Sequence, residues 1–257
     1  MDRFLHPLPP RLLGIEGVQP LEFTVREVSD LGPHMRRIRL SGAGKDFAFR
    51  AGQDVMLVLS SGERPLSRRY TIRSHDPRED LLELNIVSHG VHGPGADWVN
   101  TTEPGDRING VGPRGKIYVD EAADWHLWFG DESAIAATLS MLEALPTGAH
   151  GRAFLEVATP EDVLASDPRI TWLYRGADKP AWASELLVDA MRNADVPGGN
   201  ARVYINGEVR IVAAVQGAAL ERGVPNEQIS PKAYWGRGKA NALNGEPEKE
   251  LRDALLR

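Results

Sequence analysis

The part of the chain best suited to bind a ligand is the run RRYTIR, residues 68–73, which follows the turn-like segment RPLS. Side chains alternate between the two faces of a strand, so Arg68, Tyr70 and Ile72 are predicted to share one face. A fixed guanidinium beside an aromatic ring and a hydroxyl suits a ligand that combines a diphosphate with a flat, polar-edged ring. Taken alone, the run fits a surface strand with a cross-strand tyrosine equally well.

A glycine-rich segment, GPGADWV at residues 93–99, supports the ligand interpretation. Pro94 is suited to the first turn of a short helix. Small residues at that end let backbone amides approach a diphosphate, and the helix dipole favours its negative charge. Each segment is a weak signal by itself, but the two together indicate a binding site.

Other motifs are weaker. Residues 110–116, GVGPRGK, resemble part of a phosphate-binding loop, but Ile117 replaces the required Ser or Thr and the segment runs into a strand. His89 and His92 form an H-x-x-H pair with no third ligand nearby, so we expect a polar loop histidine and no metal. No G-x-S-x-G motif is present, which removes the usual signal of a nucleophile-elbow hydrolase.

The composition narrows the chemistry further. The 257 residues include no cysteine, which excludes disulfides, thiolate nucleophiles and Cys-ligated iron–sulfur clusters, so redox chemistry requires a bound cofactor. A formal net charge of −6 argues against general binding to nucleic acid or to a membrane surface, although a local basic patch could still meet an anionic partner. The N-terminus has no signal-peptide pattern and no stretch nears about 18 apolar residues, so we expect a soluble, cytoplasmic protein without membrane insertion.

The two halves of the chain have different patterns. Short β-type runs punctuated by Gly, Pro, Asp and Ser occupy residues 21–28, 36–40, 55–59, 70–73, 81–87 and 107–111, which predicts an antiparallel barrel or sandwich. Strand and helix then alternate, with strands at 125–129, 152–157, 170–174 and 201–205 and helices at 133–145, about 183–192 and about 209–222. This alternation predicts a parallel sheet with crossover helices. We expect domains at 18–120 and 121–257, the second ending in a charged helical tail from Ala240.

The blocks and their order resemble the siderophore-interacting, FAD-binding proteins of the ferredoxin-reductase-like superfamily. RRYTIR is similar to the R-x-Y-[ST] flavin motif, and VSHGVHGPGADW is similar to the family's phosphate segment. The later blocks VGPRG, WFGDESAIAATLSMLEALP, TWLYRG and YWGRG also match in order and spacing. The chain departs from the family pattern at Ser133, which replaces Thr, at Ile135-Ala136, which replace Leu-Pro, and at Gly236, which replaces Arg.

The resemblance implies an N-terminal antiparallel β-barrel that binds FAD and a C-terminal α/β domain like those that bind NAD(P)H, with the flavin between them. It implies a flavin diphosphate at Arg68, with Arg69 also a cofactor contact, the flavin ring against Tyr70, and a hydrogen bond from Thr71 near the reactive N5, which makes Tyr70 and Thr71 the catalytic candidates. The further expected FAD contacts are His89, Gly90, Gly93, Pro94, Gly95, Ala96, Asp131, Glu132, Ser133 and Trp235.

Arg175, Trp235 and a group of basic residues near the C-terminus each have two possible roles. Arg175 is a candidate for the phosphate of NADH or NADPH, although a salt bridge explains it equally well. Trp235 could close over the flavin or could be a core residue at a strand end. Lys232, Arg237 and Lys239 surround an aromatic pair and suit an anionic ferric chelate, with a solvated basic loop as the alternative.

These expectations predict an FAD-dependent oxidoreductase that reduces ferric siderophores with electrons from NADH or NADPH and releases Fe(II). Flavin accepts a hydride, which carries two electrons, and can release these electrons one at a time, which suits Fe(III). One alternative is a general flavoprotein reductase acting on quinones or protein acceptors, and another is a non-catalytic siderophore-binding module. A ferredoxin could replace the nucleotide as electron donor.

Overall fold

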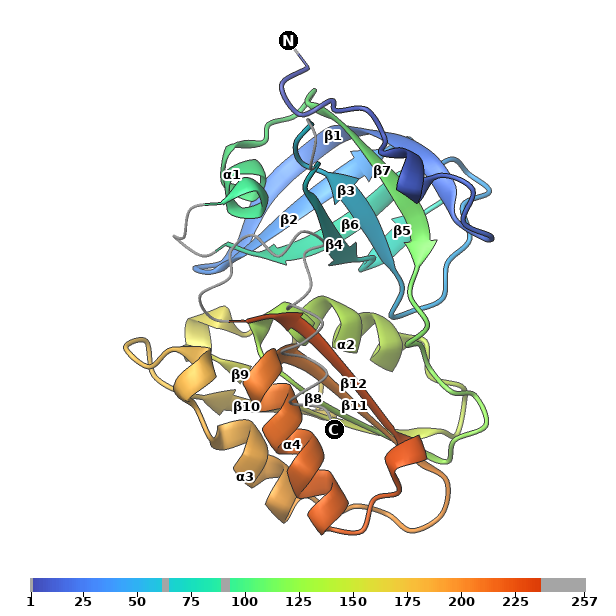
Figure 1. The fold of residues 1–257 in the computed structure, drawn as a ribbon. Coiled ribbons are helices and arrows are strands. Elements are labelled where there is room, and N and C mark those ends of the chain that lie inside the picture. Colours follow the sequence, from blue (N-terminus) through green and yellow to red (C-terminus); the bar gives the residue numbers. More distant parts are fainter. Residues whose placement is uncertain (1, 62–64, 89–92, 237–257) are drawn as a thin grey trace. The chain divides into compact units, whose positions relative to one another are not determined.

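The structure is a computed structural model that describes residues 2–61, 65–88 and 93–236 and divides into two compact units. The first consists mainly of the chain up to Tyr118, and the second mainly of the chain from Val119 onward. Figure 1 shows that the first is built mainly from strands, and that the second is a sheet flanked by helices. No helix in the described ranges is long and apolar enough to cross a membrane.

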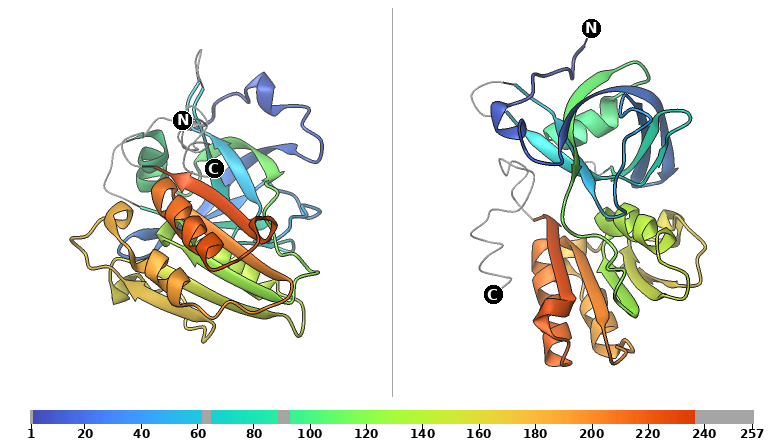
Figure 2. Two further views of the ribbon diagram at one scale, coloured as in Figure 1. Left: turned by 60° about the horizontal axis from the view of Figure 1, so that its bottom comes forward. Right: turned by 90° about the vertical axis from the view of Figure 1, so that its right-hand side faces the viewer.

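Seven antiparallel strands form the first unit, in the order β4-β3-β7-β1-β2-β6-β5. Their bounds are β1 (Gln19–Gly32), β2 (Met35–Ser41), β3 (Asp54–Val58), β4 (Ser67–Thr71), β5 (Ser74–Asp76), β6 (Leu81–Val87) and β7 (Arg107–Arg114). Alternate residues of β2 and β6 are buried, including Ile38 and Leu84, and these apolar faces line one core. The sheet curls around that core as a barrel, visible in the right-hand view of Figure 2.

Two helical segments complete this unit. A single 3-10 turn, η1 (Pro10–Leu12), buries Leu12 against Met56 and Val58 of β3. Helix α1 (Pro94–Thr101) places Trp98 and Val99 in the main core. The helix predicted from GPGADWV is therefore confirmed, and its fixed position depends on a fully buried tryptophan.

Five parallel strands form the second unit, in the order β10-β9-β8-β11-β12. The strands are β8 (Trp125–Gly130), β9 (His150–Val157), β10 (Ile170–Tyr174), β11 (Ala201–Glu208) and β12 (Ile229–Trp235). The helices are α2 (Ile135–Glu143), α3 (Leu186–Asn193) and α4 (Val209–Glu221), with 3-10 turns η2 (Glu132–Ala134), η3 (Pro160–Asp162), η4 (Ala181–Ala183) and η5 (Asn226–Gln228). Helices α3 and α4 cover one face, where they bury residues such as Leu127 and Val203.

The predicted fold class, an antiparallel barrel followed by a parallel α/β sheet, is confirmed. Two strands were not predicted. β5 is short, and β12 contains Pro231, which weakens a strand pattern but is tolerated because β12 is an edge strand. The helix expected near residues 183–192 is divided into η4 and α3. The expected helical tail lies outside the described residues.

Candidate functional site

Arg68 and Tyr70 share a face of β4, as the alternation predicts, and both lie against the backbone of Gly95 at the start of α1. A Cβ atom at Gly95 would lie 3.2 Å from the Tyr70 hydroxyl oxygen and 3.4 Å from the Arg68 Cγ. The two segments that the sequence singled out therefore meet in space. Only a residue without a side chain allows β4 and α1 this approach without displacement.

The aromatic part of this site is rigid. The Tyr70 ring packs on Trp98 with ring centroids 5.6 Å apart, and Trp98 is fully buried. Burial raises the pKa of the Tyr70 hydroxyl well above its usual value, so the hydroxyl stays protonated and can donate a hydrogen bond at neutral pH. A flat ring bound here would meet an aromatic surface whose orientation is set by the core.

The cationic part of the site is Arg68, which is only partly exposed. Its Nη1 donates to the carbonyl oxygen of Ser67 at 3.0 Å, and burial lowers the pKa of its guanidinium. A guanidinium group that has lost part of its hydration is strongly stabilised by charge-assisted hydrogen bonds with an anion. A phosphate group is such an anion, and the N-terminus of α1 supplies further donors beside Arg68.

The N-terminus of α1 has the predicted geometry. Gly93 is the N-cap, Pro94 occupies the first turn, and the amide of Asp97 donates to the Gly93 carbonyl oxygen at 2.7 Å. Ala96 lies in the same turn. His89 and Gly90, expected beside the flavin, lie outside the described residues, as does His92.

Arg69 is paired with a buried carboxylate of the neighbouring strand. Its Nε and Nη2 donate to the two carboxylate oxygens of Asp54 in β3, at 2.9 and 2.6 Å, and Asp54 is buried. Such a bidentate pair fixes the orientation of the guanidinium group, and its positive charge neutralises the buried carboxylate. This pairing gives Arg69 a structural role, and its expected cofactor contact stays a prediction. Thr71 lies opposite Asp54 in the β3–β4 register, and its place near the flavin N5 stays a prediction.

In the second unit, the turn after β8 is organised by the buried carboxylate of Asp131. One oxygen accepts from the Ser133 amide at 2.9 Å and hydroxyl at 2.5 Å, and the other accepts from the Glu208 amide at 2.8 Å and the Trp235 Nε1 at 2.9 Å. Gly207, with φ of 141°, makes room, because a Cβ there would lie 2.6 Å from the carboxylate. Asp131 thus connects the ends of β8, β11 and β12, and its expected contact with the cofactor stays a prediction.

Arg175, the candidate for a nucleotide phosphate, lies in a salt-bridge network instead. Its Nη2 pairs closely with Glu132, its Nη1 lies 3.6 Å from Glu156 in β9, and its Nε donates to the Lys179 carbonyl oxygen at 2.9 Å. The Arg175 side chain is only 8% exposed. Of the two explanations open from the sequence, the salt bridge is the one that the structure supports. Glu132 is likewise held within this unit, and the ligand contacts expected of Arg175 and Glu132 stay predictions.

Glu156 was missed by the sequence analysis. The signal was the one carboxylate in the otherwise largely apolar run AFLEV of a central strand. Its side chain is 2% exposed, and burial, with Asp131 and Glu132 nearby, raises its pKa to about 7 in spite of a hydrogen bond with Ser184 and the attraction of Arg175. Burial raises the pKa of Glu132 as well. Buried carboxylates are therefore concentrated at the carboxyl ends of β8 and β9.

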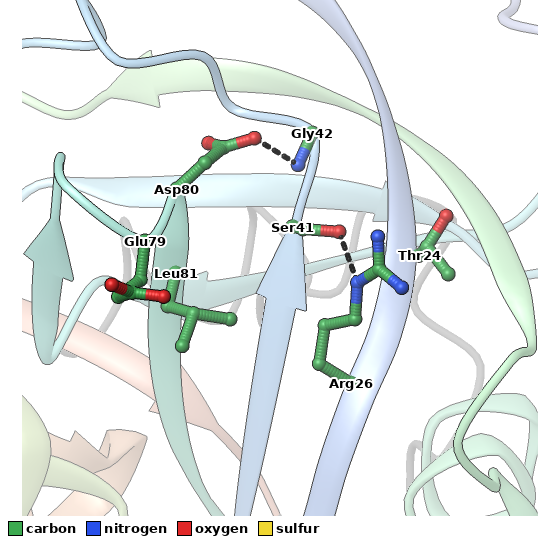
Figure 3. Close-up of a pocket in the computed structure, with 7 residues that line it drawn as sticks. All are labelled: Thr24, Arg26, Ser41, Gly42, Glu79, Asp80 and Leu81. Carbon is green, nitrogen blue, oxygen red and sulfur yellow. Dashed lines mark hydrogen bonds between the residues drawn. The ribbon is translucent and has the colours of Figure 1, made fainter.

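The predicted basic cluster is described in part. The Nζ of Lys232 lies 5.3 Å from the centre of the Tyr234 ring, so a cation and an aromatic ring do lie together on β12. Arg237 and Lys239 lie outside the described residues. A separate hollow of about 610 Å³ lies on the first unit. Figure 3 shows the residues that line it, which are Thr24, Arg26, Ser41, Gly42, Glu79, Asp80 and Leu81. None of the predicted site residues lines it.

Comparison with known proteins gives consistent results. The family model for the siderophore-interacting FAD-binding domain matches residues 48–117, and the model for siderophore-interacting protein matches residues 123–238. The ferric vibriobactin reductase ViuB of Vibrio cholerae is 33% identical over 71% of this chain and 69% of its own length. An NADPH-dependent ferric-chelate reductase of Escherichia coli is 28% identical, with 70% of each chain covered. A crystal structure of a siderophore utilization protein from T. fusca superposes with a TM-score of 0.74 and 29% identity, covering 87% of this chain and 95% of that one.

Proposed function

The chain belongs to the siderophore-interacting, FAD-binding protein family, and we propose on that basis that it reduces ferric siderophores through bound FAD, with electrons from NAD(P)H. The observation that carries the proposal is the meeting of Arg68, Tyr70 and the Gly95 backbone, which together offer a cation, an aromatic face and helix N-terminal amides. A dinucleotide cofactor with a flat ring requires this combination.

The residues of the first unit fit FAD. Arg68 and the backbone amides of Gly93, Gly95 and Ala96 would hold the diphosphate, because Pro94 has no N–H to donate. Tyr70 would contact the ring, and the Thr71 hydroxyl would hydrogen-bond its polar edge. When bound, FAD would supply the capacity to accept two electrons at once and to release them one at a time, as Fe(III) requires. The residues of this chain hold and orient the ring, and no nucleophile or general base is required.

For the substrate, we assign Lys232 and the ring of Tyr234 to an anionic ferric chelate. The ammonium group attracts the charge and the ring contacts the aromatic or carboxylate arms of the chelator. Reduction to Fe(II) weakens binding to hard oxygen ligands because Fe(II) is less charged, and the iron is released. The substrate is thus a ferric siderophore, with catecholate or carboxylate types favoured by the local positive charge.

Anaerobic turnover tests the proposal. Purified protein, reconstituted with FAD if necessary, is supplied with NADH, NADPH or a reduced ferredoxin in separate reactions, and an Fe(II)-specific chromophoric chelator traps the product. We expect flavin absorption bleached by a pyridine nucleotide and Fe(II) formed from ferric siderophores faster than a quinone is reduced. Preferential reduction of quinones would favour a general reductase, and a protein that binds siderophore but cannot take up flavin would be a binding module.

A further inference from the structure

A buried charge cluster lies at the carboxyl ends of three adjacent strands of the second unit. Glu132 follows β8, Glu156 lies near the end of β9, and Arg175 follows β10 (Figure 1). The three side chains are between 2% and 8% exposed. Open α/β sheets bind their ligands at this edge, where a dinucleotide diphosphate is normally received. Charges at this position therefore act directly on an approaching nucleotide.

The cluster contains one cation between two glutamates, and the cation lies closer to one glutamate than to the other. Arg175 pairs closely with Glu132, whereas its Nη1 stays 3.6 Å from the Oε1 of Glu156. Within the described part of the chain, neither of those two atoms has a hydrogen-bond partner, although both are buried. A fully charged Glu156 would be drawn into a hydrogen bond by the neighbouring guanidinium. The longer separation leaves the Glu156 carboxyl group without the charge-assisted hydrogen bond that would stabilise its ionised form.

The surroundings of Glu156 favour its protonated form. From the turn after β8, Asp131 and Glu132 face it with negative charge, from the end of β10 Arg175 faces it with positive charge, and Ser184 before α3 forms a hydrogen bond with it. Burial and the two acidic neighbours outweigh Arg175 and Ser184, and the pKa of Glu156 lies at about 7. Its charge therefore changes within the physiological pH range.

We propose that Glu156 sets the affinity of the sheet edge for the pyridine dinucleotide: the protonated carboxyl group admits the diphosphate, and the ionised carboxylate repels it. The inference rests on the proposed use of NAD(P)H. It gives Glu156 a specific role in donor binding, through its charge and without contact to the reacting atoms. Affinity for the nucleotide should therefore fall as the pH rises through neutrality.

Binding of NAD⁺ and NADP⁺ to the oxidised holoenzyme tests this without turnover. Dissociation constants are measured between about pH 6 and about pH 8.5 for the wild type and for Glu156→Gln, whose amide has a similar shape but does not ionise. The wild-type constant should rise about fivefold relative to that of the variant across this range, as expected for one added unit charge in a partly solvated site. The ratio between the two proteins removes any titration of the nucleotide itself.

Glu161→Gln is the matched control, because Glu161 is an exposed carboxylate on the loop after β9. It removes the same formal charge from the same edge but should keep the wild-type pH dependence. Equal pH dependence in the wild type and in Glu156→Gln, or the same loss of it in Glu161→Gln, would overturn the role of Glu156. If neither nucleotide binds at any pH, the proposed donor itself is wrong, and this inference fails with it.

A second measurement needs no variant. If binding favours the protonated form of Glu156, the holoenzyme must take up protons when the nucleotide binds near pH 7.5. Calorimetry in two buffers with different ionisation enthalpies measures that uptake. We expect a fractional uptake with NAD⁺, whose diphosphate does not titrate in this range. Binding without proton uptake would contradict the proposal even if Glu156→Gln failed to fold.

Discussion

Arg68 and Arg69 are neighbours in the sequence with different partners, so their alanine variants should fail in different ways. Arg68→Ala should weaken FAD binding by about 1.5–3 kcal/mol, the usual contribution of a hydrogen bond to a charged group, with little effect on folding. Arg69→Ala removes the guanidinium from buried Asp54 and should lower the free energy of unfolding by about 3 kcal/mol. Flavin retention on dialysis and chemical denaturation separate the two effects. Retention by Arg68→Ala equal to that of the wild type would contradict the diphosphate assignment.

Thr71→Ala should keep FAD but slow its reduction. A hydroxyl beside the ring edge orients the flavin more than it anchors the cofactor, and misorientation reduces the rate of electron transfer from the donor. Stopped-flow reduction by NADH and by NADPH, with Thr71→Ser as the control that retains the hydroxyl, measures this effect. Unchanged rates with both donors would leave Thr71 with a structural role only.

The titration of Glu156 should also be visible in stability. Because its pKa is raised from 4.5 to about 7 in the folded protein, the folded state binds the proton more tightly than the unfolded chain does. The free energy of unfolding should then fall as the pH rises through this window, by up to about 1.4 kcal/mol per pH unit, and the penalty is absent below it. The free energy of unfolding of Glu156→Gln, measured by denaturation, should exceed that of the wild type by an amount that grows from about pH 5 to about pH 7. A difference independent of pH would contradict the raised pKa.

At the scale of elements, the approach of α1 to β4 depends on Gly95. In Gly95→Ala the new methyl group would lie 3.2 Å from the Tyr70 hydroxyl oxygen, so β4 and α1 must separate slightly. Alanine is more favourable than glycine in a helix by up to about 1 kcal/mol, which offsets the cost of this separation. The free energy of unfolding should therefore change little. The ligand geometry is disturbed, and FAD binding should weaken by about 1–2 kcal/mol, within the usual range for overpacking.

The matched control for that variant is Gly217→Ala in α4, where a Cβ meets no atom within 4 Å. This change should raise the thermal midpoint slightly and leave FAD binding unaltered. Flavin fluorescence titration and a thermal melt of both variants provide the comparison. Equal FAD affinity in Gly95→Ala and in the wild type would show that the close approach is not required for binding.

At the scale of the whole molecule, a chain with a net charge of −6 must attract an anionic chelate through a local positive group. Lys232→Ala should raise the KM for a catecholate or carboxylate ferric chelate by about threefold to tenfold, and the increase should shrink near about 1 M salt, where screening reaches roughly 3 Å. A neutral hydroxamate chelate is the control and should be little affected. Equal losses for charged and neutral chelates would leave Lys232 with a packing role.

The sequence by itself determined the two architectures and the local structure of the two candidate ligand segments, because these depend on local patterns. Alternating apolar residues predicted most strands of the barrel, and the strand–helix alternation predicted the parallel sheet. The face shared by Arg68 and Tyr70 follows from the period of a strand, and the helix at Pro94 follows from its N-terminal residues. β12 was missed because Pro231 is tolerated only at a sheet edge, and strand order is not visible in a local window.

Only the tertiary structure decided which charges meet. Arg69 and Arg175 are as suitable for phosphate as Arg68 in sequence terms, but each is held by a buried carboxylate from another strand or turn. The same applies to Glu156, whose protonation depends on Asp131, Glu132 and Arg175 being brought together by adjacent strands. Electrostatic energy depends on distance and on exclusion of water, and neither is encoded by residue type or spacing alone. The physical reason for the difference is therefore range: periodic local contacts leave a pattern in the sequence, and long-range charge pairing does not.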